Sequence, residues 1–197
     1  MKKIVIASSN KNKVSEISTN IQPLFHTILS LIDFPEVGEI IEDGTTIEEN
    51  SFIKSRTSFN YTGIASIADD TILEVDYLNK EPGLYTARYA GENATSEQNM
   101  QKLLKNLKDV DQRMRTARFR TVISYVDGNN DFFVEGICEG RILESKVGNK
   151  GFGYDPIFHS TEFNMSLAQM NAVQKNDISH RGIAIKNFVS KIRDIYK

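Results

Sequence analysis

The sequence has little cysteine, no tryptophan and no long apolar run. Cys138 is the single cysteine among the 197 residues, which excludes an internal disulfide and a zinc site built from several cysteines. It lies in a strand-like stretch, residues 132–140, so we expect a buried thiol. No run approaches the roughly 18 apolar residues that a membrane-spanning helix needs. The apolar start, residues 4–7, is shorter than the roughly 7–15 residues of a secretory signal core, so we expect a cytoplasmic protein.

An excess of positive charge is also missing. There are 24 lysine and arginine residues against 26 aspartate and glutamate residues, which gives a formal net charge of −2. Proteins that bind long nucleic acids usually carry a strong basic excess, so this balance argues against such a partner. A small anionic ligand needs only a local patch of positive charge and stays compatible with the composition.

The remaining composition is that of an ordinary globular protein, with 40% hydrophobic and 25% charged residues. Hydrophobic periodicity predicts strands at residues 3–7, 26–32, 64–68, 72–75, 117–126 and 132–142. It predicts helices before Pro23 and at residues 46–59, 96–110 and 179–195. The turn residues 127–130 predict a hairpin between the two long strands. This alternation predicts a single α/β domain with a mixed sheet and flanking helices.

The first candidate site is the polar loop between the first strand and the first helix. The N-terminal end of a helix offers free N–H donors and a positive dipole end, which suit a phosphate. Ser8 and Asn10 can add neutral donors, and Lys13 can add a charge. Serine and asparagine are also ordinary helix caps, so an N-cap without a ligand is the alternative.

Pairs of neighbouring carboxylates form the second candidate site. Asp69 and Asp70 follow the apolar segment 64–68, and we expect them at the end of that strand. Burying unpaired carboxylates there would cost free energy, so a cation is expected nearby. Mg²⁺ prefers one or two carboxylates together with substrate phosphates. A solvated turn is the alternative interpretation. The pair Glu42 and Asp43 in the acidic loop is similarly ambiguous.

Two further segments contain residues suited to a nucleoside. Residues 151–156 read Gly-Phe-Gly-Tyr-Asp-Pro, in which the glycines allow close approach to a ligand and Phe152 can stack on a base. A tight turn with a core aromatic is the alternative. Residues 179–182 read Ser-His-Arg-Gly at the predicted start of the last helix, where His180 and Arg181 can contact a polar ligand edge. A surface His-Arg pair is the alternative there.

Taken together, these segments resemble the inosine triphosphate pyrophosphatase family over nearly the whole chain. The matching pieces are residues 6–13, 49–54, 68–70, 81–91, 151–158 and 179–182. The resemblance implies Mg²⁺-dependent hydrolysis of ITP, dITP and XTP to the monophosphate and pyrophosphate. It also implies a two-lobed α/β fold around an elongated mixed sheet, an active-site cleft between the lobes, and a homodimer.

The resemblance also assigns roles to residues. It places the triphosphate on the first loop, with Ser8, Asn10 and Lys13 as the principal matches within Ser8, Ser9, Asn10, Lys11, Asn12 and Lys13. It implies that Asp70 is the general base and that Glu42, Asp69 and Asp70 are the metal ligands. The remaining substrate contacts that it implies are Thr71, Phe152, Gly153, Tyr154, Asp155, Lys175, His180 and Arg181.

The sequence departs from the family at two places near these residues. Thr71 and Ile72 stand where the family usually has Ser-Gly, and Ile72 cannot take a positive φ cheaply. Gln174 stands where glutamate is usual. Two other functions are alternatives: a Maf-like pyrophosphatase for other modified nucleotides, and a nucleotide-binding module without catalysis. Retention of Glu42, Asp69, Asp70 and Lys13 argues against the inactive module.

Overall fold

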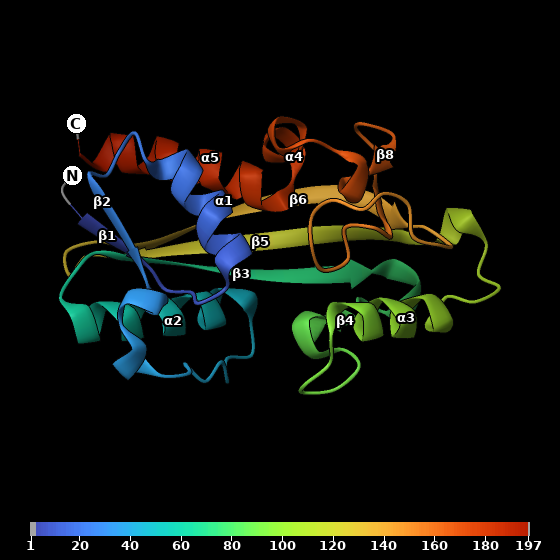
Figure 1. Ribbon diagram of the computed structural model, residues 1–197, viewed down its shortest axis with the longest axis horizontal. Helices are drawn as coiled ribbons and strands as arrows, with labels where there is room; N and C mark the ends of the chain where they lie inside the picture. The colour runs from blue at the N-terminus through green and yellow to red at the C-terminus, as the bar shows by residue number, and fades with distance from the viewer. Residues whose placement is uncertain (1–2, 197) are drawn as a thin grey trace. The chain divides into compact units, whose positions relative to one another are not determined.

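A computed structural model describes residues 3–196, and within them eight strands form one sheet (Figure 1). The strands are β1 Lys3–Ile6, β2 Thr27–Ser30, β3 Ser66–Val75, β4 Pro82–Gly83, β5 Thr116–Val126, β6 Asp131–Ile142, β7 Phe158–Ser160 and β8 Met165–Ser166. The helices are α1 Lys11–Ile21, α2 Ile47–Thr62, α3 Ser96–Asn106, α4 Ala172–Ile178 and α5 His180–Ile195. None of these helices is both long and apolar enough to cross a membrane.

The sheet is mixed, as the sequence predicts. Its strand order is β2-β1-β3-β5-β6-β7-β8, with β4 beside β3. Strand β1 pairs in parallel with β2 and with β3, whereas β4 pairs antiparallel with β3, and β7 pairs antiparallel with β6 and β8. The mixed α/β fold is therefore confirmed.

The chain divides into two compact units. Within the described residues, unit 1 contains residues 3–70, 121–136 and 184–196, and unit 2 contains residues 71–120 and 137–183. Each unit has its own apolar cluster.

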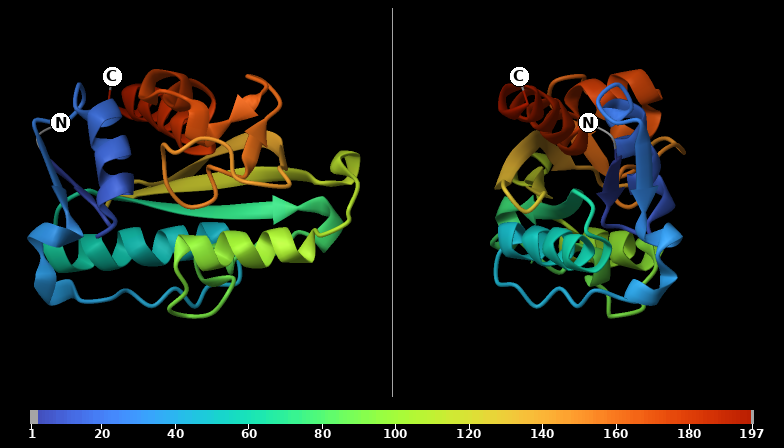
Figure 2. Two further views of the ribbon diagram at one scale, coloured as in Figure 1. Left: turned by 45° about the vertical axis from the view of Figure 1, so that its right-hand side comes forward. Right: turned by 90° about the vertical axis from the view of Figure 1, so that its left-hand side faces the viewer.

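Helices α1 and α5 enclose the apolar core of unit 1. Figures 1 and 2 show these two helices on one face of the unit 1 strands and α2 on the opposite face. Ile17 and Ile21 of α1 and Phe188 of α5 pack with the strand residues Ile4 and Ile67. All five are almost fully removed from water, so burial of apolar surface holds α1 and α5 in place.

The opposite face of unit 1 packs through small polar side chains. Ser51 and Ser55 of α2 are buried, and both contact the buried Ser124 of β5 at 2.9 and 2.8 Å between hydroxyl oxygens. Ser51 also donates to the Ala68 carbonyl at 3.0 Å. Small side chains allow close approach of the helix to the sheet, and the hydrogen bonds satisfy the hydroxyls that this approach buries.

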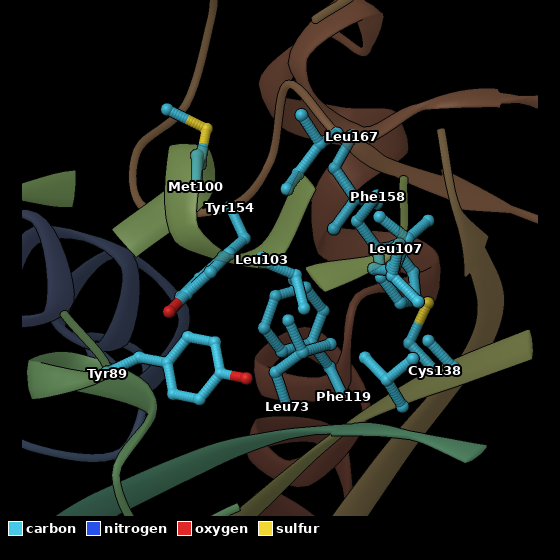
Figure 3. Packing of buried hydrophobic residues seen from close by; sticks show 14 of the residues in the cluster. Leu73, Tyr89, Met100, Leu103, Leu107, Phe119, Cys138, Tyr154, Phe158 and Leu167 are labelled. Carbon is cyan, nitrogen blue, oxygen red and sulfur yellow. The ribbon is translucent and has the colours of Figure 1, made fainter. Parts of the chain in front are cut away.

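Unit 2 has a core of aliphatic, sulfur-containing and aromatic residues. Figure 3 shows Met100 and Leu103 of α3 gathered with Leu73, Phe119 and Tyr154. Phe119 also lies 4.7 Å from Phe158, measured between ring centroids. The cluster includes Cys138, which is buried, as the sequence predicts. Burial raises the pKa of the Cys138 thiol to about 12.

The structure differs from the local predictions in several places. Residues 11–13 belong to the first turn of α1 rather than to the loop, because the Asn10 side chain accepts from the N–H groups of Asn12 and Lys13 and begins the helix there. Asp69 and Asp70 do not end a strand, because β3 continues through them to Val75. Helix α4 was not predicted at all.

Candidate active site

Two lysines of unit 1 are each in contact with acidic side chains. Lys54, on α2, donates from Nζ to Glu42 Oε2 at 2.9 Å and to Asp70 Oδ1 at 3.0 Å. Lys13, on α1, has its Nζ 3.3 Å from Asp69 Oδ2. The Asp69 side chain is fully buried, and one tenth of the Lys54 side chain is exposed. Because water is largely excluded, these attractions are stronger than those of exposed ion pairs.

The alternation of β3 explains why the two aspartates contact different lysines. Successive side chains of a strand point to opposite faces of the sheet. Asp69 contacts Lys13 of α1, and Asp70 contacts Lys54 of α2, and these two helices lie on opposite faces of unit 1 (Figure 1). Asp70 therefore shares its face with Glu42.

Burial and charge act in opposite directions on this cluster. Burial raises the pKa of Asp70 above its ordinary value, although attraction by Lys54 and Lys13 offsets part of the rise. Burial by itself lowers the pKa of Lys54, but the charges of Asp70 and Glu42 outweigh it and raise that pKa. Lys54 therefore stays charged, while Asp70 becomes a stronger proton acceptor than an ordinary aspartate.

The chemistry of the same cluster fits a hard divalent cation. Within residues 3–196, no group of three or more His, Cys, Asp or Glu side chains is arranged to hold a metal ion. Two carboxylates, Glu42 and Asp70, nevertheless converge on one cation, the ammonium of Lys54. A pair of carboxylates completed by substrate phosphates is a donor set that suits Mg²⁺. Asp69 adds negative charge from the other face of β3.

The loop before α1 is ordered by its own side chains. Asn10 Oδ1 accepts from Asn12 N at 3.0 Å and from Lys13 N at 3.3 Å, and Ser8 Oγ accepts from Asn10 N at 3.2 Å. Ser9, Asn10, Lys11 and Asn12 are exposed. The predicted N-cap is thus present, and it presents an exposed helix N-terminus beside Lys13.

A second cluster, in unit 2, brings two cations to an aromatic ring. Lys175 Nζ lies 4.7 Å from the centroid of the Phe152 ring, and the guanidinium carbon of Arg181 lies 5.6 Å from it. Lys175 also donates to Asp155 Oδ2 at 2.8 Å. All three charged side chains are buried. The structure therefore brings together Phe152, Asp155, Lys175 and Arg181, which the resemblance assigns to one substrate group.

The other predicted residues of unit 2 have different surroundings, and Thr71 among them contacts the cluster. Thr71 Oγ1 accepts a hydrogen bond of 3.2 Å from Arg181. His180 stacks on Phe119 with ring centroids 4.4 Å apart. Tyr154 is buried and donates to the Thr86 carbonyl at 2.9 Å, so its ring belongs to the core rather than to a ligand surface. Gly153 has φ +62° and nothing within 4 Å of where a Cβ would lie.

The two departures from the family pattern have simple structural outcomes. Ile72 is buried within β3, so the chain forms no glycine-like turn at this position. Gln174 occupies the third position of α4, where its Oε1 accepts from Asn171 N at 3.0 Å while Asn171 Oδ1 accepts from Gln174 N at 2.9 Å. This reciprocal capping box fixes the start of the helix that carries Lys175.

Sequence reasoning missed Lys54. The residue lies in the segment 49–54 that carries the resemblance, but it was assigned no role. Helical periodicity could not reveal it, because Ser51 and Ser58 lie with Lys54 on the buried face of α2 and are not apolar. A lysine on the buried face of a helix needs an acidic partner.

The fold and the two clusters define an α/β protein with a carboxylate–lysine site in one unit and an aromatic–cation site in the other. Comparison with known proteins identifies the family. The chain belongs to the Ham1 family, whose sequence model matches residues 4–191. A protein of Vibrio vulnificus, named dITP/XTP pyrophosphatase, is 43% identical over 197 residues and is covered to 98%, as is this chain. One of Christiangramia forsetii with the same name is 48% identical, with 95% of this chain and 97% of the relative covered.

Solved structures agree with this assignment. The Ham1 protein of Staphylococcus aureus matches with a TM-score of 0.87 and 38% identity, covering 99% of this chain and all of that one. A Ham1 protein from Coxiella burnetii matches with a TM-score of 0.89 and 35% identity, covering 98% of this chain and all of that one. The resemblance stated from the sequence and the fold class are both confirmed.

Proposed function

We propose that this protein is a nucleoside triphosphate pyrophosphatase that hydrolyses non-standard purine nucleotides, ITP, dITP and XTP, to the monophosphate and pyrophosphate. The observation that carries the proposal is the contact of Lys54 with both Glu42 and Asp70 in a partly buried cluster of unit 1. The relatives named dITP/XTP pyrophosphatase support the same activity and substrate class.

The unit 1 cluster supplies the groups that phosphate chemistry requires. Lys13 and the exposed N-terminus of α1 bind phosphate oxygens through charge and N–H donors. Asp70 orients the attacking water and accepts its proton. Lys54 neutralises charge on the carboxylates and is placed to donate to a phosphate oxygen that comes beside them.

Mg²⁺ is the proposed cofactor, held by Glu42 and Asp70 with the substrate phosphates. Bound there, it would neutralise the negative charge that develops on the phosphate oxygens. Asp69 contributes negative charge to this region and holds Lys13 at the same time.

The unit 2 cluster supplies recognition of the base. Lys175 and Arg181 only donate hydrogen bonds, so they suit the 6-oxo group of hypoxanthine and xanthine and leave the 6-amino group of adenine unmatched. Such a mismatch can be rejected by as much as about 10⁴-fold. Phe152 stacks on any purine and adds affinity without discrimination.

Other parts of the assignment stay predictions. They are the cytoplasmic location, the homodimer, and the cleft between lobes that the resemblance implies.

Release of pyrophosphate from a panel of purine and pyrimidine triphosphates, with and without Mg²⁺, tests the proposed function. We expect turnover of ITP, dITP and XTP, weak turnover of ATP, and none in excess chelator. A preference for pyrimidine nucleotides would favour a Maf-like pyrophosphatase instead. Tight binding of ITP without turnover would favour an inactive nucleotide-binding module.

A further inference from the structure

Asp155 organises the loop that carries Phe152. Its Oδ2 accepts one hydrogen bond from the backbone N–H of Phe152 and another from Lys175 Nζ, and each is 2.8 Å long. The Asp155 side chain is 5% exposed, and that of Lys175 is 11% exposed. This carboxylate oxygen therefore accepts hydrogen bonds from within the protein. The Asp155–Lys175 pair lies beside the Phe152 ring.

Gly151 allows the Asp155 carboxylate to lie this close to the loop. Gly151 has φ +75°, and a Cβ built on it would lie 2.0 Å from Asp155 Oδ2. Any other residue would push the carboxylate away from Phe152 N and Lys175. Close approach of the carboxylate to the loop thus depends on glycine at this position.

The Asp155–Lys175 pair lies beside the aromatic ring on which we expect the base to stack. Lys175 and Arg181 both lie over Phe152. A base stacked on that ring would lie close to both cations. The negative charge of Asp155, in contact with Lys175, lowers the positive potential there, and burial keeps this effect strong.

We propose that Asp155 is a positioning residue that sets the preference of this site between xanthine and hypoxanthine nucleotides. The inference rests on the proposed function. Both bases carry the 6-oxo group, so Lys175 and Arg181 can donate to either one. Xanthine has a second oxo group and is the stronger acid, so it carries a negative charge near neutral pH while hypoxanthine stays neutral. By offsetting the charge of Lys175, Asp155 keeps the neutral base a good substrate.

Substitutions of opposite sign test this inference through the ratio of kcat/KM for XTP over ITP, which share one sugar. Asp155→Asn keeps the shape and removes the negative charge, so it should raise the ratio about tenfold, as expected for one partly buried charge at close range. Lys175→Met removes the positive charge and should lower the ratio. The double variant should return toward the wild-type ratio.

Glu97→Gln is the matched control. Glu97 pairs with Lys146 at 3.0 Å in the same unit, but both side chains are about half exposed. This variant changes the net charge as Asp155→Asn does, and it should leave the ratio unchanged. A shift of the ratio equal to that of Asp155→Asn would overturn the inference.

Binding of XMP and IMP, measured by calorimetry, gives a readout that needs no turnover. The same opposite shifts are expected in the ratio of their dissociation constants. Equal losses for both bases, or shifts in one direction for both single variants, would overturn the inference and show that Asp155 only holds the loop together. If Asp155→Asn does not fold, Lys175→Met decides: a lower ratio supports the inference and an unchanged ratio overturns it. A wild-type protein that releases no pyrophosphate from either nucleotide would refute the proposed function, while the binding ratios would still test the inference.

Discussion

Asp69 and Asp70, neighbours in β3, direct their carboxylates to opposite faces of the strand and contact different lysines. The two carboxylates therefore have different partners and are expected to have different roles. Asp70 shares Lys54 with Glu42, whereas Asp69 holds Lys13 beside the N-terminus of α1. The adjacent aspartates are not interchangeable, and their variants should differ in kind.

We expect Asp70→Asn to lower kcat by about 10²–10⁴-fold while leaving much of the nucleotide binding, because the proton acceptor is lost and the phosphate contacts remain. Steady-state kinetics together with equilibrium binding of dITP checks this. Asp131→Asn is the matched control, since Asp131 pairs with Arg56 on the exposed surface of the same unit. Turnover of Asp70→Asn near that of the control would remove Asp70 from the mechanism.

Lys13→Ala should weaken binding of the triphosphate more than binding of the monophosphate, because several negative charges gather at the N-terminus of α1. Dissociation constants for ITP and IMP measure the difference. Equal losses for the two ligands would mean that Lys13 serves only to neutralise Asp69.

Lys54→Met should destabilise the fold by about 1–3 kcal/mol, because Glu42 and Asp70 would remain close together, partly buried, without their shared cation. Mg²⁺ should then restore part of the stability, since it can replace the missing ammonium between the carboxylates. Thermal unfolding with and without Mg²⁺ tests this. A rise in Tm with Mg²⁺ that is no larger in the variant than in the wild type would contradict the proposed metal position.

Arg181→Ala should reduce the preference for ITP over ATP, whereas Phe152→Ala should raise KM for all purines alike. Arg181 donates hydrogen bonds that distinguish the two bases, and Phe152 offers only a stacking surface. The ratio of kcat/KM for ITP and ATP in each variant separates these roles. An unchanged ratio in Arg181→Ala would show that the start of α5 does not recognise the base.

Asp127 gives a prediction about stability and pH. Burial raises its pKa, but hydrogen bonds from Tyr196 and from the N–H groups of Asn129 and Asn130 outweigh burial and lower the pKa to about 2, from an ordinary 3.8. The charged form is thus favoured in the folded state, so its stabilisation is complete above pH 3.8 and is lost as the pH falls toward 2. The Tm difference between wild type and Asp127→Asn should be largest at neutral pH and should shrink across that range. A difference that stays constant from pH 7 to pH 2 would contradict this.

The sequence predicted those features that rest on local chemistry. Asn10 caps α1 as its residue type suggests, and Thr46 accepts from Glu49 N at the start of α2, three residues along. The long hairpin β5–β6 follows from the turn residues at 127–130. The mixed sheet follows from the alternation of strands and helices.

Features that depend on tertiary contacts were not predictable in the same way. The continuation of β3 through Asp69 and Asp70 is supported by pairing with β4, which places Leu73 opposite Gly83. Helix α4 has only seven residues and leaves Val173 71% exposed, so it shows no amphipathic pattern. The role of Lys54 depends on two carboxylates that lie 12 and 16 residues away in the chain. Local sequence patterns do not show which distant residues come into contact in the fold.

The products of dITP hydrolysis in ¹⁸O-labelled water test the central claim most directly. The account predicts equal amounts of dIMP and pyrophosphate, with one labelled oxygen in dIMP, because the water that Asp70 orients attacks the α-phosphorus. Formation of dIDP and orthophosphate, or label in the pyrophosphate, would contradict it.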